Sequence, residues 1–377
     1  MKSVIYATNA SAPYKVGMLN ALSKRIPELL AIYLTPQEYM RKWSDPLADS
    51  EHAYIQLNAA KLNILTMETA QYFSLRFLFT LLTQRPKAVI FAPYSQIVFM
   101  LGFVICKLRG IPALIWYESH ESSSIAPSLL RRFGKFVRKL VLCNASAIVV
   151  PGKLAKTSAL NIGVHSQKIF LAPHSIRNEL FSEAFINYSP SSGFVAISRY
   201  IKNYDRVLIY VGQFVARKNL DLLISTFIKV KSDLGNCCLI LIGDDPEKIT
   251  TKNPDILVAG FLEGQDIARV LHLSNGLVLP SLVEVWGLVV NEAAAAGLPV
   301  IVSTSCGAHE VVHDHITGYH FEARDAHSLA GALRKWRNGY NGMDRNVIRE
   351  LLTQKYNFEQ MAIGFEAAIK FSTPPTS

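Results

Sequence analysis

The sequence lacks the cysteine patterns that build disulfide frameworks or zinc sites. Its 377 residues include five cysteines, none of which forms a Cys-x-x-Cys pair or joins histidines at zinc-ligand spacing. This odd, scattered set is typical of reduced thiols in a cytosol-like compartment. Three histidines around Asp314, which are His309, His313 and His315, match no strong metal-binding motif either, so we expect no bound metal.

The sequence also lacks an uninterrupted apolar run of membrane-spanning length. The nearest approach is residues 88–117, where two prolines, a glycine and two cations interrupt the run. A buried strand, a helix and a second strand explain this stretch better than a membrane span does. We expect no signal peptide, because the first two residues lead directly into a strand-like segment. Together these absences predict a cytoplasmic protein.

Acidic residues are fewer than basic ones. The chain has 39 lysines and arginines against 29 aspartates and glutamates, which gives a net charge of +10. Such a balance favours anionic partners, for example nucleotide diphosphates, anionic lipids or nucleic acids. The aromatic residues do not alternate with the cations in any recognisable nucleic-acid module, so we expect no nucleic-acid partner.

The length and the hydrophobic content, 50% of the residues, predict two domains with sizeable cores. Strand and helix patterns alternate over residues 1–175 and again over 205–350, as in open, mostly parallel sheets with helices on both faces. Residues 176–204 are less regular and are expected to connect the two lobes. Residues 351–377 are expected to form a final helix and tail, with packing of the helix back on the first lobe as one arrangement. Ligands of such α/β lobes bind at the carboxyl ends of the strands.

The segment 279–303 is the most informative part of the chain. A short apolar strand leads into a loop with Glu284, and a helix begins after Gly287 and carries Glu292 one turn further on. The first amides of that helix, at Leu288 and Val289, lack intrahelical partners and suit a phosphate. Glu292 is then placed to accept hydrogen bonds from ribose hydroxyls. The simpler alternative is two surface glutamates beside a buried helix.

A second segment points to the same chemistry. A strand-like run at 207–211 ends at Gly212, and Arg217 and Lys218 arrive just before the next helical pattern. A lysine and an arginine at that position can neutralise a diphosphate, the lysine as a point charge and the arginine as a fork. A solvated basic loop is the alternative.

These residues resemble the donor half of the retaining GT-B glycosyltransferases of family 4, the group 1 glycosyl transferases. The family frame P-S-x-x-E-x-x-G-x-x-x-x-E-A-x-A-x-G-x-P-V is matched over residues 280–300. The resemblance implies an α/β fold of GT-B architecture, with two Rossmann-like doubly wound lobes facing across a cleft. It also implies a donor-sugar contact for Glu284, ribose binding for Glu292 and diphosphate binding for Lys218. One departure is Gln213, where the family often has arginine; Arg217 is the candidate to supply that charge.

The first lobe is expected to bind the acceptor. Tyr14 and Lys15 follow the first strand, and Glu118 and His120 follow a later one, so all four are acceptor-side candidates. A histidine comparable to His120 contacts the donor sugar in some family members, which makes His120 a catalytic candidate beside Glu284 and Lys218. A solvent-exposed loop histidine is the alternative. For His174, at the join between lobes, we expect a hinge or packing role.

A basic amphipathic helix is predicted over residues 129–141. Its apolar residues share one face, and its cations, Arg131, Arg132, Lys135, Arg138 and Lys139, share the opposite one. Such a helix can attract anionic lipid at about 1 kcal/mol per cation near the surface. Equally, it can bury its apolar face on the sheet and expose its cations to water.

The leading hypothesis is metal-independent transfer of a sugar from a nucleotide-diphosphate-sugar to a hydroxyl of a glycan or lipid-linked acceptor, with retention, in bacterial polysaccharide or lipopolysaccharide biosynthesis. The nucleotide sugar is a co-substrate, and no further cofactor is expected. The resemblance also suggests a peripheral location on the inner face of the membrane. Two alternatives are a nucleotide-sugar epimerase of the same architecture and a catalytically inactive, membrane-associated subunit that binds a nucleotide.

Overall fold

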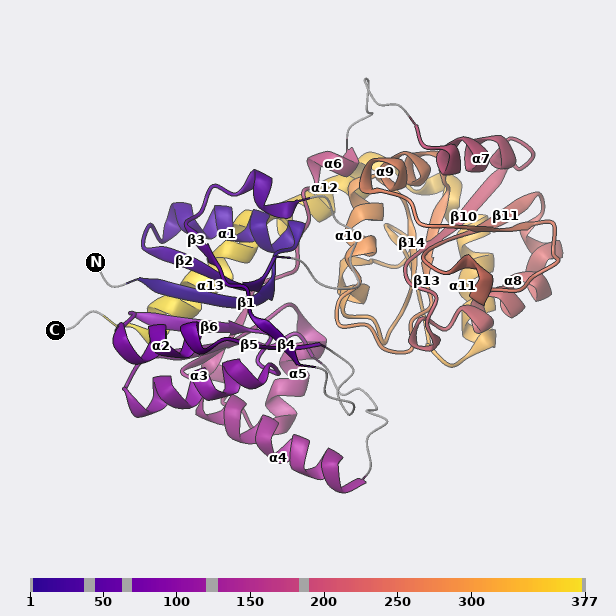
Figure 1. Ribbon diagram of the computed structural model, residues 1–377. Coiled ribbons are helices and arrows are strands. Elements are labelled where there is room, and N and C mark those ends of the chain that lie inside the picture. Colours follow the sequence, from indigo (N-terminus) through magenta and orange to yellow (C-terminus); the bar gives the residue numbers. More distant parts are fainter. Residues whose placement is uncertain (1–2, 37–44, 63–69, 120–127, 183–189, 375–377) are drawn as a thin grey trace. The chain divides into compact units, whose positions relative to one another are not determined.

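The computed structural model describes residues 3–36, 45–62, 70–119, 128–182 and 190–374. The chain divides into two compact units (Figure 1). The first consists of Met1–Ser175 together with Phe358–Ser377, and the second of Ile176–Asn357. Among the helices in these ranges, none combines the length and the apolar character that crossing a bilayer requires.

The first unit contains a seven-stranded parallel sheet in the order β3-β2-β1-β6-β7-β8-β9. Its strands are β1 (Val4–Ala10), β2 (Leu29–Thr35), β3 (Tyr54–Gln56), β6 (Ala88–Ala92), β7 (Ala113–Trp116), β8 (Ala147–Val150) and β9 (Ile169–Leu171). A separate antiparallel pair joins β4 (Ala60–Leu62) to β5 (Gln71–Phe73). The central strands are continuous apolar runs because helices bury both of their faces.

Helices cover the two faces of this sheet in two layers. One layer consists of α2 (Leu75–Thr83), α3 (Ile97–Leu108), α4 (Ser128–Asn144) and α5 (Lys153–Ile162), whose buried side chains share one core cluster. The other layer consists of α1 (Pro13–Arg25) and α13 (Phe358–Ser372), which form a second cluster on the opposite face.

The C-terminal helix α13 belongs to the first unit although it follows the second unit in the chain. A Cβ added to Gly17 of α1 would lie only 2.3 Å from the Phe358 ring, so α1 and α13 pack closely. Arg25 Nε lies 2.6 Å from Glu366 Oε2 at the same interface. Glycine at position 17 therefore allows the end of the chain to complete the first unit.

The second unit contains a six-stranded parallel sheet in the order β12-β11-β10-β13-β14-β15. Its strands are β10 (Arg206–Val211), β11 (Cys237–Ile242), β12 (Ile256–Ala259), β13 (Gly276–Leu279), β14 (Val300–Ser303) and β15 (Gly318–Phe321). Its helices are α6 (Glu179–Ser182), α7 (Ser192–Ile201), α8 (Leu220–Leu234), α9 (Gly264–Leu273), α10 (Leu288–Ala295), α11 (Ala326–Gly339) and α12 (Arg345–Lys355). Both units are thus doubly wound α/β structures, as the sequence predicted.

The described residues of 176–204 differ from the connector that we expected, because they group with the second unit. Helix α7 packs against α9 and buries Ile197 in the core of that unit. A Cβ on Gly193 would lie 2.9 Å from the Leu262 side chain. The sequence of α7 alone does not show which unit the helix packs against, because the burial of Ile197 depends on the contact with α9.

Candidate functional site

The carboxyl end of β10 leads into a loop that presents two cations. Gly212 closes the strand, and its amide donates to the carbonyl of Ile242 at 2.9 Å. A short 3-10 turn, η3 (Ala216–Lys218), then places Arg217 and Lys218 just before α8. Asn219 ends this turn in the left-handed region, at φ +58°, and its amide group donates to the carbonyl of Ala323 at 2.8 Å. The loop is therefore fixed by backbone and side-chain contacts.

Both cations meet the carboxylate of Glu284. The Lys218 ammonium and the Arg217 guanidinium contact the same oxygen, Oε2, with the Arg217 Nη1 atom 3.0 Å away. Lys218 is buried and Arg217 is about half exposed. The structure thus brings together three predicted donor-site residues from two distant segments. Arg217 supplies the second cation at a loop where Gln213 follows the glycine.

The backbone of Glu284 is held by a neighbouring segment that begins after β14. Glu284 pairs with Cys306 as an isolated parallel bridge, and its carbonyl accepts from the amide of Gly307 at 3.0 Å. A Cβ on Gly307 would lie 2.0 Å from the carbonyl oxygen of Val285. Only glycine fits there, so the loop that carries Glu284 is locked against the start of the 3-10 turn η5 (Gly307–Val311).

Helix α10 begins at this loop. Gly287 precedes it with φ +97°, and a Cβ there would lie 2.8 Å from the Leu279 side chain. No side chain caps the helix, and the first turn bond runs from the amide of Val290 to the carbonyl of Gly287 at 2.9 Å. The amides of Leu288 and Val289 therefore lie at a helix start that suits an anion.

Glu292 lies one turn into α10 and is partly buried. Burial raises the pKa of its carboxyl to about 7. No ion-pair partner for it occurs among the described residues. A desolvated carboxyl group of this kind gains most from a ligand that donates hydrogen bonds to it.

Asn291 is a residue that sequence reasoning missed. It is fully buried, and its Oδ1 accepts from the indole Nε1 of Trp286 at 2.8 Å. This bond ties the loop between Glu284 and Gly287 to the body of α10. A polar residue inside an otherwise apolar helix was the available signal.

The candidates of the first unit also gather, at the carboxyl ends of its strands. The Lys15 Nζ atom lies 3.0 Å from Thr8 Oγ1 and 3.1 Å from Asn9 Oδ1, at the end of β1. Glu118 follows β7, and its Oε1 lies 2.8 Å from Nε2 of His174. Burial alone would raise the pKa of Glu118, but the hydrogen bond and charge of His174, together with Lys15, hold that pKa below its usual value.

His174, for which we expected a hinge or packing role, packs its ring against two aromatic side chains and also pairs with a carboxylate. Its ring makes edge contacts with Tyr14 and Trp116, with centroids 5.3 and 5.2 Å apart, while its Nε2 atom pairs with Glu118. Tyr14, Lys15, Glu118 and His174 therefore form one connected group. The remaining candidate of this unit, His120, lies outside the described residues.

The histidines around Asp314 do not form a metal centre within the described ranges. Asp314 Oδ1 lies 2.9 Å from Nδ1 of His320, a residue that the sequence did not single out. The Nε2 atom of His320 lies 2.9 Å from the carbonyl oxygen of His309. His313 and His315 are exposed. These contacts join β15 to the η5 turn.

The basic helix α4 buries only part of its apolar side. Val141 and Leu142 enter the core, whereas Phe136 and Leu140 are exposed. Arg132, Lys135 and Lys139 are exposed, and Arg138 is half-buried. The side chain of Arg131 lies outside the described residues.

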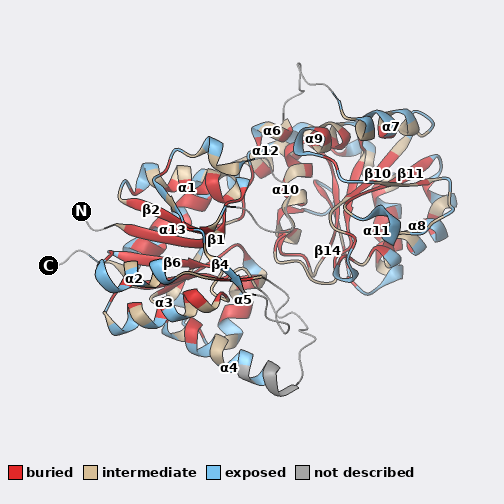
Figure 2. Cartoon of the chain, in the orientation of Figure 1, coloured by how far each residue is buried: buried red, intermediate tan, exposed pale blue. Residues whose placement is uncertain are grey.

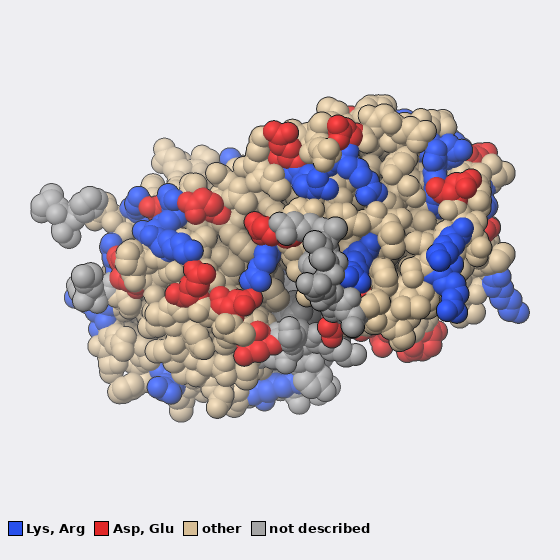
Figure 3. Space-filling view, turned by 90° about the horizontal axis from the view of Figure 1, so that it is seen from above, with Lys and Arg blue, Asp and Glu red and all other residues tan. Residues whose placement is uncertain are grey.

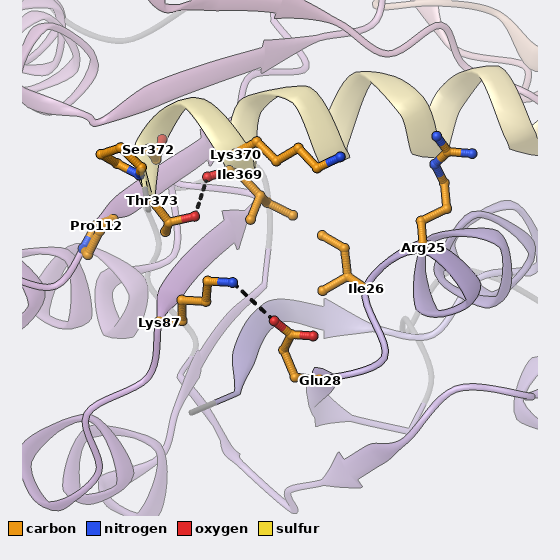
Figure 4. A pocket seen from close by; sticks show the side chains of 10 residues that line it. Arg25, Ile26, Glu28, Lys87, Pro112, Ile369, Lys370, Ser372 and Thr373 are labelled. Carbon is orange, nitrogen blue, oxygen red and sulfur yellow. Dashed lines mark hydrogen bonds and ion pairs between the residues drawn. The ribbon is translucent and has the colours of Figure 1, made fainter. Parts of the chain in front are cut away.

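A pocket of about 850 Å³ lies at the other edge of the first sheet (Figure 4). Glu28, Lys87 and Pro112 line it, and each precedes a strand, so the pocket is at the amino ends. Lys87 Nζ and Glu28 Oε1 lie 3.2 Å apart and pair with each other. Because ligands of doubly wound sheets bind at the carboxyl ends, this pocket is not our candidate site.

Comparison with known families supports the predicted resemblance. Residues 198–350 match the model of the family described as Glycosyl transferases group 1. The chain is 28% identical over 185 residues to the lipopolysaccharide 1,2-N-acetylglucosaminetransferase of Salmonella typhimurium, covering 44% of this chain and 48% of that protein. It is 33% identical over 136 residues to the N-acetyl-alpha-D-glucosaminyl L-malate synthase of Bacillus anthracis, covering 34% and 35%. The chain spans about half the length of the first curated relatives that it matches.

Solved structures resemble the whole chain. The HepE protein of Anabaena, in complex with UDP and glucose, superimposes with a TM-score of 0.71 at 12% identity, covering 98% of this chain and all of that one. The lipopolysaccharide outer core galactosyltransferase WaaB superimposes with a TM-score of 0.67 at 15% identity, covering 97% and 99%. These likenesses show that the two Rossmann-like units adopt the GT-B fold.

Proposed function

We propose that this chain, whose residues 198–350 match the group 1 glycosyl transferases, transfers a sugar from a nucleotide-diphosphate-sugar to a hydroxyl of a glycan or lipid-linked acceptor. The observation that carries the proposal is the assembly of Lys218, Arg217 and Glu284 beside the uncapped start of α10. Two cations and a helix start are a suitable set of groups for a diphosphate.

In the proposed reaction, the bond between the anomeric carbon and the diphosphate oxygen breaks. The acceptor oxygen forms its bond on the same face of the sugar, and the leaving phosphate takes the acceptor proton. The configuration is therefore retained. Lys218, Arg217 and the amides of Leu288 and Val289 stabilise the charge that develops on the diphosphate. This stabilisation requires no metal.

The two glutamates have different tasks in this proposal. Glu284 gives up part of its contact with the cations when a diphosphate arrives, and it then orients the sugar. Glu292 accepts hydrogen bonds from the ribose hydroxyls, because its carboxyl is desolvated and one helical turn beyond the phosphate amides. Gly212 and Gly287 let the two loops turn tightly beside the proposed diphosphate position, because a Cβ at either residue would lie 2.8 Å from a neighbouring side chain.

The acceptor is assigned to the first unit. Tyr14, Lys15 and Glu118 lie at the carboxyl ends of its strands, with His120 in the segment that follows. The similarity to the lipopolysaccharide 1,2-N-acetylglucosaminetransferase of Salmonella typhimurium supports a glycan or lipid-linked acceptor in a bacterial surface-polysaccharide pathway. We further propose that the protein works in the cytoplasm, peripherally on the membrane, with the exposed cations of α4 facing anionic lipid.

An inactive nucleotide-binding subunit of the same fold is the second candidate. Gln213 favours this candidate, because glutamine replaces a cation that the family often has at this position.

The first test measures the melting temperature of the protein with UDP, GDP, ADP or TDP, since a ligand of the native state raises the melting temperature. Lys218→Ala and Glu292→Ala are expected to abolish the shift. The exposed residues Lys229 and Glu247 provide matched alanine controls in the same unit.

A melting-temperature shift with one nucleotide that both site variants abolish supports the donor site. Turnover of the matching nucleotide sugar then separates an enzyme from an inactive subunit. No shift with any of the four nucleotides contradicts the proposed donor site.

A further inference from the structure

The positive charge of the chain is concentrated in one stretch of the first unit. Residues 70–175 contain thirteen lysines and arginines, and their only acidic residues are Glu118 and Glu121. The whole chain has a net charge of +10, so the remaining residues together carry slightly more acidic than basic groups. Helices α2, α3 and α4 all lie in this stretch and contain no acidic residue.

These three helices form one layer on one face of the sheet. Buried side chains from each of them, such as Phe77, Phe103 and Leu142, belong to the same core cluster. Their opposite sides therefore point away from the sheet, and Figure 2 shows exposed residues along them.

The outer sides of α2 and α3 carry large apolar side chains. They recur at helical spacing, and we call them the outer apolar patch: Leu75, Phe79 and Leu82 of α2, and Leu101, Val104 and Leu108 of α3. Their exposed fractions range from 43% for Leu101 to 83% for Leu108. Phe136 and Leu140 of α4 are similarly exposed. Helices α2 and α3 pack against each other, so the outer apolar patch spans two neighbouring helices. Exposed apolar groups of this kind mark interaction surfaces.

Exposed cations accompany the outer apolar patch. Arg76 lies on α2, Lys107 on α3, and Arg132, Lys135 and Lys139 on α4. None of these five forms an ion pair with another residue that the structure describes.

Cations on the opposite face of the same sheet are paired. Lys24 of α1 lies 2.9 Å from Glu51, and Arg25 lies 2.6 Å from Glu366 of α13. On the side of the molecule seen in Figure 3, basic and acidic side chains lie next to one another. The α2, α3 and α4 layer thus differs in both charge and apolar exposure.

We propose that the outer apolar patch inserts into the interface of a lipid bilayer with anionic headgroups, while the cations of α2, α3 and α4 contact the phosphates. The proposal goes beyond charge attraction by α4 and does not depend on the glycosyl-transfer activity. Helix α3 has 12 residues and is about 18 Å long, which is short of the roughly 30 Å hydrocarbon core. The layer therefore lies on the membrane rather than crossing it.

A second copy of the chain is a poorer occupant of this surface. In a two-fold dimer the same patch lies on both sides of the contact. The cationic layers of the two copies would then face each other, and helices α2, α3 and α4 contain no acidic residue to pair with those cations. A lipid surface with anionic headgroups matches the charge and the apolar side chains together.

Flotation of the full chain with vesicles tests this proposal. Vesicles of phosphatidylcholine alone are compared with vesicles in which about one third of the lipid is anionic phosphatidylglycerol. Leu82→Ser combined with Leu108→Ser is expected to lower the partition coefficient on anionic vesicles about tenfold. Ile228→Ser combined with Leu273→Ser, at positions 44% and 46% exposed in the second unit, is the matched control and is expected to change nothing.

A tryptophan probe distinguishes insertion from charge attraction alone. The wild-type fluorescence spectrum is subtracted from that of each variant. The added tryptophan emission of Phe79→Trp is expected to shift to the blue on anionic vesicles. The added emission of Phe261→Trp, in the second unit, is expected not to shift. Absence of vesicle binding, or binding that Leu82→Ser with Leu108→Ser leaves unchanged, overturns the proposal. A stable dimer that this double variant dissociates also overturns it, in favour of a second copy. An unchanged nucleotide-induced melting shift in the double variant shows that the fold and the donor site are intact.

Discussion

Lys218 contacts the carboxylate of Glu284 although 66 residues separate them in the sequence. Both side chains are largely removed from solvent, and Arg217 approaches the same oxygen. Glu284 therefore pairs with the two cations that we propose as diphosphate ligands. The pair links the loop after β10 to the loop before α10.

The first prediction concerns the pH dependence of nucleotide binding. Burial raises the pKa of Glu292 to about 7, so the carboxyl is mostly protonated at pH 6 and mostly ionised at pH 8. Ribose hydroxyls donate better to the ionised form. The affinity for the preferred nucleoside diphosphate is expected to rise by up to about tenfold between these pH values. Calorimetric titration at the two pH values measures this affinity. Glu292→Gln is expected to remove the rise in affinity, except for the part that comes from ionisation of the nucleotide phosphate.

The second prediction concerns the stability of the free protein. Because the folded-state pKa of Glu292 lies above its unfolded value, the folded state favours the protonated form. Its stabilising contribution is full below about pH 4.5 and is lost as the pH rises through about 7. Glu292→Gln keeps the shape of the neutral carboxyl. At pH 8 this variant is expected to melt about 2 to 4 °C above the wild type, and at pH 5 the two proteins are expected to have the same melting temperature. An equal difference at both pH values contradicts this reading.

The third prediction concerns Gly287. Its φ of +97° and the 2.8 Å approach to the Leu279 side chain oppose any Cβ. Gly287→Ala is expected to lower the free energy of unfolding by about 1 to 3 kcal/mol and to weaken nucleotide binding. Gly331→Ala in α11 is the matched control, because nothing lies within 4 Å of its added Cβ. That variant is expected to be about 0.5 to 1 kcal/mol more stable, as measured by denaturant unfolding.

The fourth prediction concerns the pair of Glu118 and His174. The pKa of Glu118 is held low in the folded protein, so its contribution to stability is present above its unfolded pKa and is lost as the pH falls through the folded value. Glu118→Gln and His174→Ala are each expected to destabilise the protein at pH 7. A double-mutant cycle is expected to give a coupling of about 1 to 3 kcal/mol. Additive effects of the two substitutions show that the pair carries no such coupling.

The positions of the proposed donor-side residues in the fold could be predicted because their signals are local. A strand, a glycine and a helix start fix where Glu284, Gly287 and Glu292 lie, since the helix must begin after the glycine. The strand and helix alternation likewise predicted both doubly wound units. Local patterns therefore sufficed where one segment builds its own geometry.

Other relationships depend on packing between distant segments. No pattern in the sequence pairs His174 with Glu118, because this pair forms only after separate elements have packed. The burial of Ile197, which makes α7 part of the second unit, also depends on its contact with α9. The exposure of Leu82 and Leu108 could not be predicted either, since an apolar helix usually hides such residues.

The most direct test of the account is the affinity of a nucleoside diphosphate for Glu284→Gln beside Lys218→Ala, measured by calorimetric titration. Glutamine does not compete for the cations, so Glu284→Gln is expected to bind the nucleotide as tightly as the wild type or more tightly, while losing sugar transfer. Lys218→Ala is expected to bind about tenfold or more weakly. Equal losses of affinity in the two variants would contradict the proposal that a diphosphate replaces the Glu284 carboxylate as the partner of Lys218 and Arg217.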